Sequence, residues 1–430
     1  MTERQRLALD FRQNLAIALL SVMAVALFAR TELFHLGWET VSGEFQAVSE
    51  PPETAPEEPV PSTLSVPVRF AATGVYGDVR GRYVSLGMKT GERAFRGVRR
   101  LFREALESST DFDRISRETF LSSVRGSSLY CDFLTPLPLS LLCGLLDASS
   151  TDERPVRCMA LARDWDGVRL YIWDGGAEYS GRLTAISGRQ VDELVSNYEL
   201  GSGVFGMDFQ DADGRRRNVS PLSLFPDKAP SLPVYAVSVS LPDTGQLLTA
   251  FRFNPLTKSR YTEANGTEVI MEGGRSVRIR TNGTIYYQSG ERGELSIESA
   301  AEIPTTWEAV TECAALLNSI LVAQGYAPVI PREVRRQDNL TLLRFGYALN
   351  GVPVFHADGG AAAVVTLDCR KVVSVELRPR RYSATDAQSL LLPLEQALGV
   401  AELHPGAELC LGYQDNGGAR MNAQWFAVPE

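Results

Sequence analysis

The sequence has few of the residues on which most enzymes depend. Histidine occurs three times in 430 residues, at His35, His356 and His404. No HExxH, G-x-S-x-G or P-loop motif is present, and no lysine follows a serine at the spacing of an SxxK nucleophile. A lone histidine in a loop is more often a solvated side chain than a catalytic base. An enzyme is therefore the least favoured class, and we expect no cofactor and no catalytic residue.

The charge balance also excludes a partner class. Aspartate and glutamate outnumber lysine and arginine by 52 to 43, which gives a net charge of -9. A protein that binds nucleic acid needs a basic face to meet the phosphate backbone. We therefore expect no nucleic-acid partner.

Cysteine is present, but in a pattern that gives no metal site. The six cysteines include no CxxC pair, and several are flanked by apolar residues, as in Leu141-Leu142-Cys143. Buried free thiols are the favoured interpretation because free cysteine packs like a small hydrophobic residue. A Cys369–Cys410 or a Cys131–Cys143 disulfide is the alternative. Two acidic turns, Asp164–Gly167 and Asp211–Gly214, fail as EF-hand loops because essential carboxylates are missing. We therefore expect no metal.

One apolar run near the N-terminus dominates the remaining pattern. Residues 14–29 carry no charge, which is at the short end of the roughly 17–25 residues needed to span a bilayer. Arginines precede the run and glutamates follow it: Arg4, Arg6, Arg12, Glu32, Glu39 and Glu44. The positive-inside rule then predicts a single-pass protein of the cell membrane, with a cytoplasmic N-terminus and an outer ectodomain. A cleaved signal peptide is the alternative, with Ala24-Val25-Ala26 as the cleavage site.

The rest of the chain predicts an α+β ectodomain of antiparallel sheets with packed helices. The division we predict is a tail and anchor at 1–31, a Pro/Glu-rich stalk at 32–67, and ectodomain parts at 68–186, 187–302 and 303–430. Apolar spacing predicts helices over Gly91–Leu106, Ser116–Val124, 189–199 and a run opened by Thr305-Thr306-Trp307-Glu308, which fits a capping box.

Strands and turns are predicted from alternation and turn residues. Two strands joined by Asp164–Gly167 form a hairpin, and Leu247–Phe253 is predicted as another strand. Asn265-Gly266, Gly273-Gly274 and Asn282-Gly283 predict type I′ turns of a meander. Further strands are predicted over Leu340–Leu349, Val352–Phe355, Ala362–Leu367, Val372–Leu377, Glu408–Tyr413 and Met421–Val428. A last helix starts near Leu392, because Pro393 is tolerated only in a first turn, and ends at Gly399.

Two sets of residues are candidates for partner contact. Ala16, Ser21 and Ala24 are small residues that would allow close packing of the anchor against another membrane helix. Arg96, Arg99 and Arg103 lie on the arginine-rich helix, whose positive face would suit an acidic protein or an anionic polymer. A solvated helix with i,i+4 ion pairs is the plainer interpretation of these arginines.

Three stretches also resemble a known family. They are the basic tail, anchor and ectodomain layout; Leu222–Asp227 with Phe251–Pro255 and Tyr286-Tyr287; and Arg344–Phe355 with Leu392-Pro393, Gln396-Ala397, Leu411–Tyr413 and Trp425–Val428. In these features the chain resembles the YycH/YycI family of membrane-anchored regulators of the sensor histidine kinase WalK. The arginine-rich, lysine-poor composition departs from typical low-GC Gram-positive members and points to a divergent clostridial-type relative.

The resemblance implies a function without catalysis. It implies a three-part α+β ectodomain and a protein that tunes a two-component sensor kinase through its anchor helix and extracytoplasmic contacts. The partners would be the kinase and, as a second candidate, a paralogous regulator. The rival hypothesis is a cell-envelope module that binds or scaffolds an anionic wall polymer through its sheet faces or the arginine helix.

Overall fold

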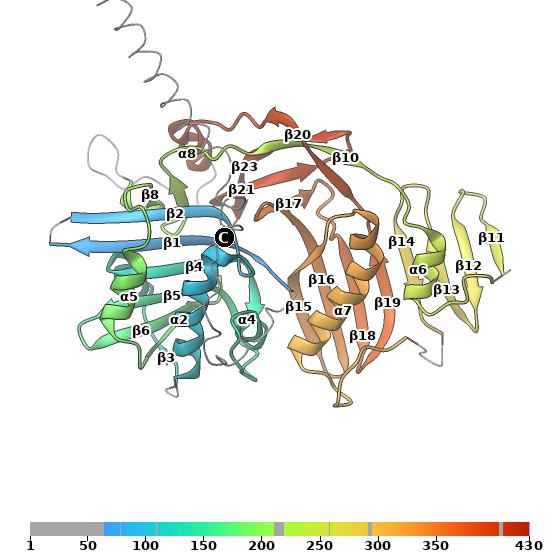
Figure 1. The fold of residues 1–430 in the computed structure, drawn as a ribbon, viewed down its shortest axis with the longest axis horizontal. Coiled ribbons are helices and arrows are strands. Elements are labelled where there is room, and N and C mark those ends of the chain that lie inside the picture. Colours follow the sequence, from blue (N-terminus) through green and yellow to red (C-terminus); the bar gives the residue numbers. More distant parts are fainter. Residues whose placement is uncertain are drawn as a thin grey trace, which may run out of the picture. The chain divides into compact units, whose positions relative to one another are not determined.

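The computed structural model describes residues 64–77, 79–108, 111–209, 219–257, 259–290, 295–403 and 407–429. These residues form an α+β fold of mainly antiparallel sheets (Figure 1). They belong to one compact unit. None of the helices described is long and apolar enough to span a membrane. The predicted anchor and most of the predicted stalk lie outside the residues described.

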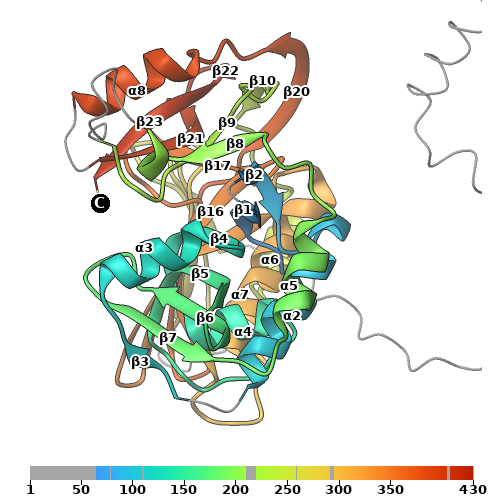
Figure 2. The ribbon, with the colours of Figure 1, turned by 90° about the vertical axis from the view of Figure 1, so that its left-hand side faces the viewer.

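The first sheet is built from the N-terminal part of the described chain and is covered on both faces. Its antiparallel order is β2 (Val79–Lys89), β1 (Pro67–Tyr76), β4 (Ser128–Pro138), β5 (Pro155–Asp164), β6 (Gly167–Trp173), β7 (Tyr179–Leu183) and β3 (Asp113–Arg114). Figure 2 shows α2 (Arg96–Glu107) and α5 (Gly188–Val195) on one side of this sheet and α3 (Arg117–Arg125) on the other. This double cover explains why residues 67–74 of β1 are all buried rather than alternating.

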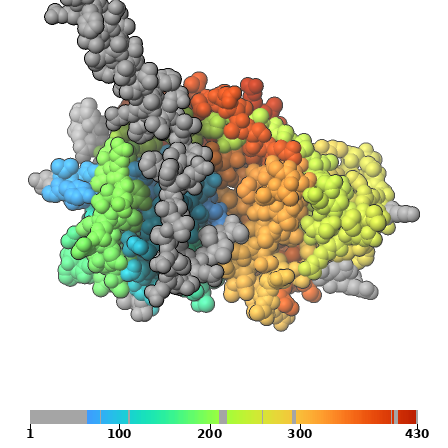
Figure 3. Space-filling view, in the orientation of Figure 1, coloured from blue at the N-terminus to red at the C-terminus, as the bar shows by residue number. Residues whose placement is uncertain are grey.

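The second sheet has eleven strands. Burial alternates along some of them, as over Ala363–Leu367, whereas others are buried throughout, as over residues 408–413. Its order is β11 (Arg260–Thr262), β12 (Glu268–Glu272), β13 (Arg275–Ile279), β14 (Ile285–Gln288), β19 (Lys371–Leu377), β18 (Ala363–Asp368), β16 (Leu340–Leu349), β17 (Val352–His356), β21 (Ala407–Asp415) and β23 (Ala423–Pro429), with β15 (Val329–Gln337) beside β16. The β17–β21 pair is parallel. Helices α6 (Thr244–Ala250) and α7 (Thr306–Leu321) lie side by side on one face (Figure 1), and their surfaces adjoin in Figure 3.

Smaller elements connect these sheets. A three-stranded sheet has the order β20 (Arg381–Gln388), β10 (Pro233–Ser238) and β22 (Arg420–Met421), and β8 (Gly203–Phe205) pairs with β9 (Leu224–Pro226). The remaining helices are α4 (Leu139–Leu145), α8 (Leu394–Glu402) and the 3₁₀ turns η1 (Arg93–Phe95), η2 (Gly206–Asp208) and η3 (Val322–Gln324).

The two large sheets meet through α4 and α7. A Cβ added to Gly144 of α4 would lie 2.2 Å from the Trp307 ring of α7, so only glycine allows this approach. The hydroxyl groups of Ser140 and Thr306 donate to the two carboxylate oxygens of Glu153, at 2.9 and 2.8 Å. Packing of Trp307 on Gly144 and the hydrogen bonds to the Glu153 carboxylate therefore connect the two sheets.

Most predicted helices and strands are confirmed. Thr305 caps α7 as predicted: its side chain accepts a hydrogen bond from the Glu308 backbone N–H, and the Glu308 carboxylate accepts from the Thr305 backbone N–H. The helices predicted over Gly91–Leu106, Ser116–Val124 and 189–199 correspond to η1 with α2, α3 and α5. The Asp164–Gly167 hairpin joins β5 to β6, and the C-terminal strands are present within a few residues.

One element prediction is wrong, and one predicted helix ends later than expected. Leu247–Phe253 was predicted as a strand but lies mostly in α6, because the Asp243 side chain caps a helix by accepting from the Gln246 N–H. The last helix begins at Leu394, directly after Pro393, and continues past Gly399 to Glu402. Apolar content alone did not distinguish a short buried helix from a strand.

Two of the three predicted type I′ turns are also wrong. At Asn265-Gly266 and Asn282-Gly283 only the glycine has positive φ, whereas a type I′ turn needs positive φ at both residues. Each asparagine side chain instead accepts from the backbone N–H two residues on, as in an Asx turn. Gly273-Gly274 does have two positive φ values, 59° and 87°.

Candidate functional site

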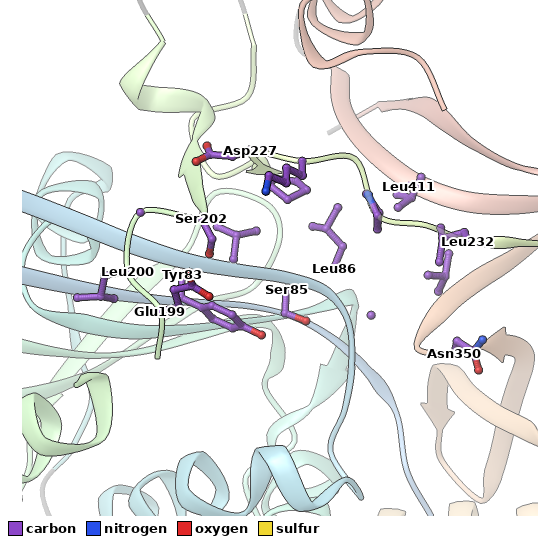
Figure 4. Close-up of a pocket in the computed structure, with 17 residues that line it drawn as sticks. Tyr83, Ser85, Leu86, Glu199, Leu200, Ser202, Asp227, Leu232, Asn350 and Leu411 are labelled. Carbon is purple, nitrogen blue, oxygen red and sulfur yellow. The ribbon is translucent and has the colours of Figure 1, made fainter. Parts of the chain in front are cut away.

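A concave feature lies along the outer edge of β2, and we call it the strand-edge cleft (Figure 4). Its volume is about 520 Å³, within the usual 300–1,000 Å³ range of ligand pockets. It is lined by Tyr83, Val84, Ser85, Leu86, Gly87, Glu199, Leu200, Gly201, Ser202, Pro226, Asp227, Lys228, Pro230, Leu232, Asn350, Val352 and Leu411. These residues come from β2, from the segments before β8 and after β9, from the β16–β17 turn and from β21.

The floor of the cleft is the edge of a sheet. β2 is the terminal strand of the first sheet, and within the part of the chain that the structure describes only β1 pairs with it. At one end of the cleft the Arg82 carbonyl accepts from the N–H groups of Gly201 and Ser202, at 2.6 and 2.8 Å. At the other end, a Cβ added to Gly351 would lie 1.8 Å from the Gly87 carbonyl oxygen. The cleft is thus the stretch of β2 edge between these two contacts.

The Gly87 contact depends on the Asn350–Gly351 turn, which was not among the turns predicted from the sequence. Asn350 and Gly351 have φ values of 49° and 76°, the positive pair of a type I′ turn, and they join β16 to β17. Asn-Gly between two strands is the strongest local signal for such a hairpin, so the sequence contained this information. The turn closes one end of the cleft.

The walls of the cleft carry apolar and charged groups but no histidine or cysteine. Leu86 and Val352 are buried apolar side chains, and Tyr83 stacks on Tyr198 with ring centroids 5.0 Å apart. Glu199, Asp227 and Lys228 are exposed at the rim. This composition suits recognition of a chain segment more than acid–base chemistry.

The segment Gly201–Gly206 beside the cleft matches the spacing G-x-G-x-x-G. In a dinucleotide-binding fold these glycines follow a parallel strand and open a helix. Here the segment contains β8, which pairs antiparallel with β9, and leads into the three-residue η2. The context needed to cradle a pyrophosphate is absent from this described segment, so the match carries no cofactor assignment.

A second candidate surface is the face of the eleven-stranded sheet opposite α6 and α7, which we call the open face. Strand register aligns one row of residues across eight strands: Tyr261, Val269, Arg278, Tyr286, Glu376, Val364, Arg344 and Glu333. Tyr261, Arg278 and Arg344 are exposed, whereas Tyr287, adjacent to Tyr286, is buried on the helix side. The row mixes arginine, tyrosine and glutamate along a broad surface.

A shallow groove of about 350 Å³ lies in the middle of the open face. The Arg280 guanidinium lies over the Tyr286 ring, with its central carbon 4.3 Å from the ring centroid. Arg278 of β13 pairs with Tyr286 of β14. Glu376 also lines the groove, but Arg378 donates to it at 3.1 Å. The groove therefore presents two exposed arginines beside a partly exposed aromatic ring.

A buried ionic network joins the first sheet to β21. Arg69 donates to Asp132 and to Glu408, and Arg157 donates to Glu408 and lies 3.3 Å from Asp132. Arg69, Asp132 and Glu408 are all 5% exposed or less. Burial alone would raise the pKa of the Asp132 carboxyl, but the Arg69 and Arg157 guanidiniums outweigh burial and lower it to about 2. The two guanidiniums and two carboxylates pair with one another, as burial of charge requires, although Arg69 Nε has no hydrogen-bond partner among the described residues.

A second buried cluster surrounds His356, one of the three histidines of the chain. The His356 side chain is 7% exposed, and its Nδ1 lies 3.7 Å from Asp415 Oδ2. Asp415 also accepts from the Tyr382 hydroxyl at 3.0 Å and from Arg380 at 3.3 Å. Burial lowers the pKa of His356, and Asp415 opposes this shift without reversing it. These side chains line neither the strand-edge cleft nor the groove on the open face.

The predicted contact arginines lie on α2 as expected but do not form one free face. Arg96 is exposed, whereas Arg103 is partly buried. Arg99 is tied down, since its guanidinium donates to the Thr90 carbonyl and lies 3.4 Å from Asp147. The structure thus leaves Arg96 for contact and gives Arg99 an intramolecular partner. Ala16, Ser21 and Ala24 lie outside the residues described.

All six cysteines are free thiols, so neither alternative disulfide is formed. Five are buried, and Cys369 is partly exposed. No cluster of histidine, cysteine, aspartate and glutamate that would hold a metal ion occurs in the described residues. The Asp164–Gly167 turn is a hairpin turn whose Asp166 binds Arg169 at 2.5 Å, and Asp211–Gly214 lies outside the described part.

Comparison with known proteins adds no relative: neither a scan of family models nor a search of curated proteins matched this chain.

Proposed function

We propose that this protein is a non-enzymatic regulator, anchored by a single N-terminal membrane helix, whose extracytoplasmic part tunes a sensor histidine kinase. The proposal includes the layout predicted from the sequence: tail and anchor at 1–31, stalk at 32–67 and a three-part ectodomain. It places the N-terminus in the cytoplasm and the ectodomain outside. It extends the resemblance to the YycH/YycI family.

The observation that carries the proposal is the strand-edge cleft. It presents a strand edge, apolar walls and a charged rim, features that recognise polypeptide, and its lining has no histidine or cysteine. The buried charges of Arg69, Asp132 and Glu408 pair with one another within the fold. The chemistry available at the surface is thus that of binding.

The anchor helix would supply the second contact. Residues 14–29 include Ala16, Ser21 and Ala24, which would let two membrane helices approach closely. A regulator needs only a differential contact of a few kcal/mol to change the ratio of two kinase states. Contact in the bilayer and contact at the ectodomain would therefore act together on one equilibrium.

A second candidate function is binding of an anionic cell-envelope polymer. The groove on the open face favours it, because Arg278 and Arg280 are exposed beside Tyr286. Arginine suits phosphate or carboxylate groups, and an aromatic ring adds a flat apolar contact. Reversing both charges (Arg278→Glu with Arg280→Glu) should weaken co-sedimentation with an anionic wall polymer. Arg96→Glu with Arg103→Glu is the matched change on α2 and tests the arginine helix in the same assay.

The experiment that tests the leading proposal is crosslinking in native membranes followed by pull-down. It uses the full-length protein and a variant whose residues 14–30 are replaced by an unrelated spanning helix. Recovery of a histidine kinase with the native anchor alone would support contact in the bilayer, and recovery with both would support contact at the ectodomain. If neither recovers a kinase, the regulator proposal is wrong, and retention of wall polymer would then favour the alternative.

A further inference from the structure

We propose that the strand-edge cleft binds an extended segment of the partner's extracytoplasmic polypeptide as an added strand beside β2. This inference rests on the proposed function and specifies how the ectodomain contact would be made. The added segment would make the first sheet eight-stranded, with main-chain hydrogen bonds supplying the contact and side-chain pockets supplying the selectivity.

The direction of the β2 backbone groups follows from one observed contact. The Arg82 carbonyl points away from β1, because it accepts from Gly201 and Ser202 on the outer side. In an antiparallel pair, the N–H and C=O of alternate residues point to the same side of the strand. The groups of Val84 therefore point outward as well, and those of Tyr83 and Ser85 point to β1, with which these residues pair. The register shifts between Ser85 and Met88, so the alternation does not extend to Leu86.

The outward groups of Val84 face the cleft. Val84 lines it, and no strand pairs with β2 on that side in the described part of the chain. An exposed row of main-chain donors and acceptors is a template for another strand. The same groups have no comparable complementarity to a helix, whose backbone bonds are internal, or to a sugar polymer.

The two ends of the cleft limit the length of the added strand. Gly201 and Ser202 occupy the edge at Arg82, and the Asn350–Gly351 turn occupies it at Gly87. At about 3.3 Å per residue, the four residues from Tyr83 to Leu86 offer an edge of roughly 13 Å. A partner segment of about four residues would pair there.

The walls indicate the side chains of the occupant. Leu86, Leu232, Val352 and Leu411 form a buried apolar wall, so the occupant would place apolar side chains at alternate positions. Glu199, Asp227 and Lys228 are all exposed at the rim, so the rim favours neither sign of charge in the occupant. The occupant is therefore an extended segment with apolar side chains at alternate positions.

The test is hydrogen–deuterium exchange at single-residue resolution on the full-length protein in membranes, with and without the kinase. Strand addition predicts that the amide of Val84 exchanges at least about tenfold more slowly with the kinase present. The amides of Tyr83 and Ser85 already bond to β1, so their exchange should change by less than about twofold. Equal slowing at all three positions, or none, would overturn strand addition.

A photo-crosslinking residue at Ser85 supplies an independent readout, with one at Tyr286 on the open face as the matched control. Capture of one short kinase segment at Ser85 and not at Tyr286 is the expected result. If the kinase is still pulled down but neither Ser85 capture nor slower Val84 exchange occurs, this inference fails while the proposed function stands. If capture at Ser85 yields wall polymer, the inference is likewise overturned. If no kinase is recovered under any condition, both fail together.

Discussion

The two large sheets of this protein bury their residues in different ways. The seven-stranded sheet is covered on both faces, by α2 and α5 on one side and α3 on the other (Figure 2). The eleven-stranded sheet carries α6 and α7 on one face and has exposed arginines and tyrosines on the other. A sheet covered on both faces can offer a partner only its edges, whereas a sheet with an open face can offer a broad surface.

This difference assigns distinct binding modes to the two sheets. The seven-stranded sheet offers the edge of β2 at the strand-edge cleft, which suits an extended polypeptide. The eleven-stranded sheet offers the Arg278, Arg280 and Tyr286 groove, which suits an anionic polymer. The regulator proposal and its rival therefore concern different parts of one molecule and can be tested by separate variants.

The largest difference in unfolding free energy should separate Tyr287 and Tyr286, which are adjacent in β14 but lie on opposite faces of the eleven-stranded sheet. Tyr287→Ala should cost about 3–5 kcal/mol of unfolding free energy, because Tyr287 is 1% exposed and stacks on Phe251. Tyr286→Ala, on the open face, should cost less than about 1 kcal/mol. In the seven-stranded sheet, Leu129→Ala and Tyr130→Ala should both be costly, at about 2–5 kcal/mol each. Denaturant unfolding measures all four, and a large Tyr286 effect would contradict the open face.

The next effect concerns the ionic network that joins the first sheet to β21. Asp132→Ala should cost about 3–5 kcal/mol, because it leaves the buried Arg69 without one of its carboxylates. Asp166→Ala removes the partner of Arg169 at the surface, where solvent screens the pair, and should cost much less. Equal costs in denaturant unfolding would show that the network contributes no more than a surface pair.

A smaller effect should separate two glycines with similar backbone conformation. Gly351 and Gly417 have φ values of 76° and 73°, but a Cβ at Gly351 would lie 1.8 Å from the Gly87 carbonyl oxygen, whereas one at Gly417 meets nothing within 4 Å. Gly417→Ala should cost about 1–2 kcal/mol for the left-handed conformation. Gly351→Ala should cost about 1–3 kcal/mol more, for overpacking at the end of the cleft. Equal losses of stability would mean that the turn does not contact β2 closely.

The smallest expected effect is the acid sensitivity of the same network. In the folded protein the pKa of the Asp132 carboxyl is lowered to about 2, from its ordinary value of 3.8, by the Arg69 and Arg157 guanidiniums. A carboxyl with a lowered pKa stabilises the fold above its unfolded pKa and loses that contribution as the pH falls toward the folded value. About 2 kcal/mol should thus disappear between roughly pH 4 and pH 2. Asp132→Asn should flatten this part of the stability curve, and an unchanged slope would contradict the assignment.

Much of the fold could be predicted because its local signals are strong. The Thr305 capping box fixes the start of α7, and alternation in the meander fixes the strands from β12 to β14. The prediction failed where one local pattern is compatible with both a strand and a short helix. The Leu247–Phe253 run is apolar in either a strand or a short helix, and the Asp243 cap that decides between them lies four residues upstream.

The candidate sites were harder to predict, because they depend on contacts between distant segments. The strand-edge cleft brings residues 83–87 together with Asn350 and Leu411, and no local pattern encodes that pairing. The network links Arg69 to Glu408 across 339 positions. The arginine helix was found from sequence, but the loss of Arg99 to the Thr90 carbonyl depends on packing that spacing does not show.

The most direct test of this account is hydroxyl-radical footprinting of the full-length protein in membranes, read at individual tyrosines. Tyr261 and Tyr286 on the open face should be oxidised readily, whereas Tyr130 and Tyr171, within the doubly covered sheet, should be protected until the protein unfolds. Comparable oxidation of Tyr171 and Tyr286 would contradict the difference between the sheets. That result would also contradict the assignment of polypeptide binding to the edge of the seven-stranded sheet and of polymer binding to the open face of the eleven-stranded sheet.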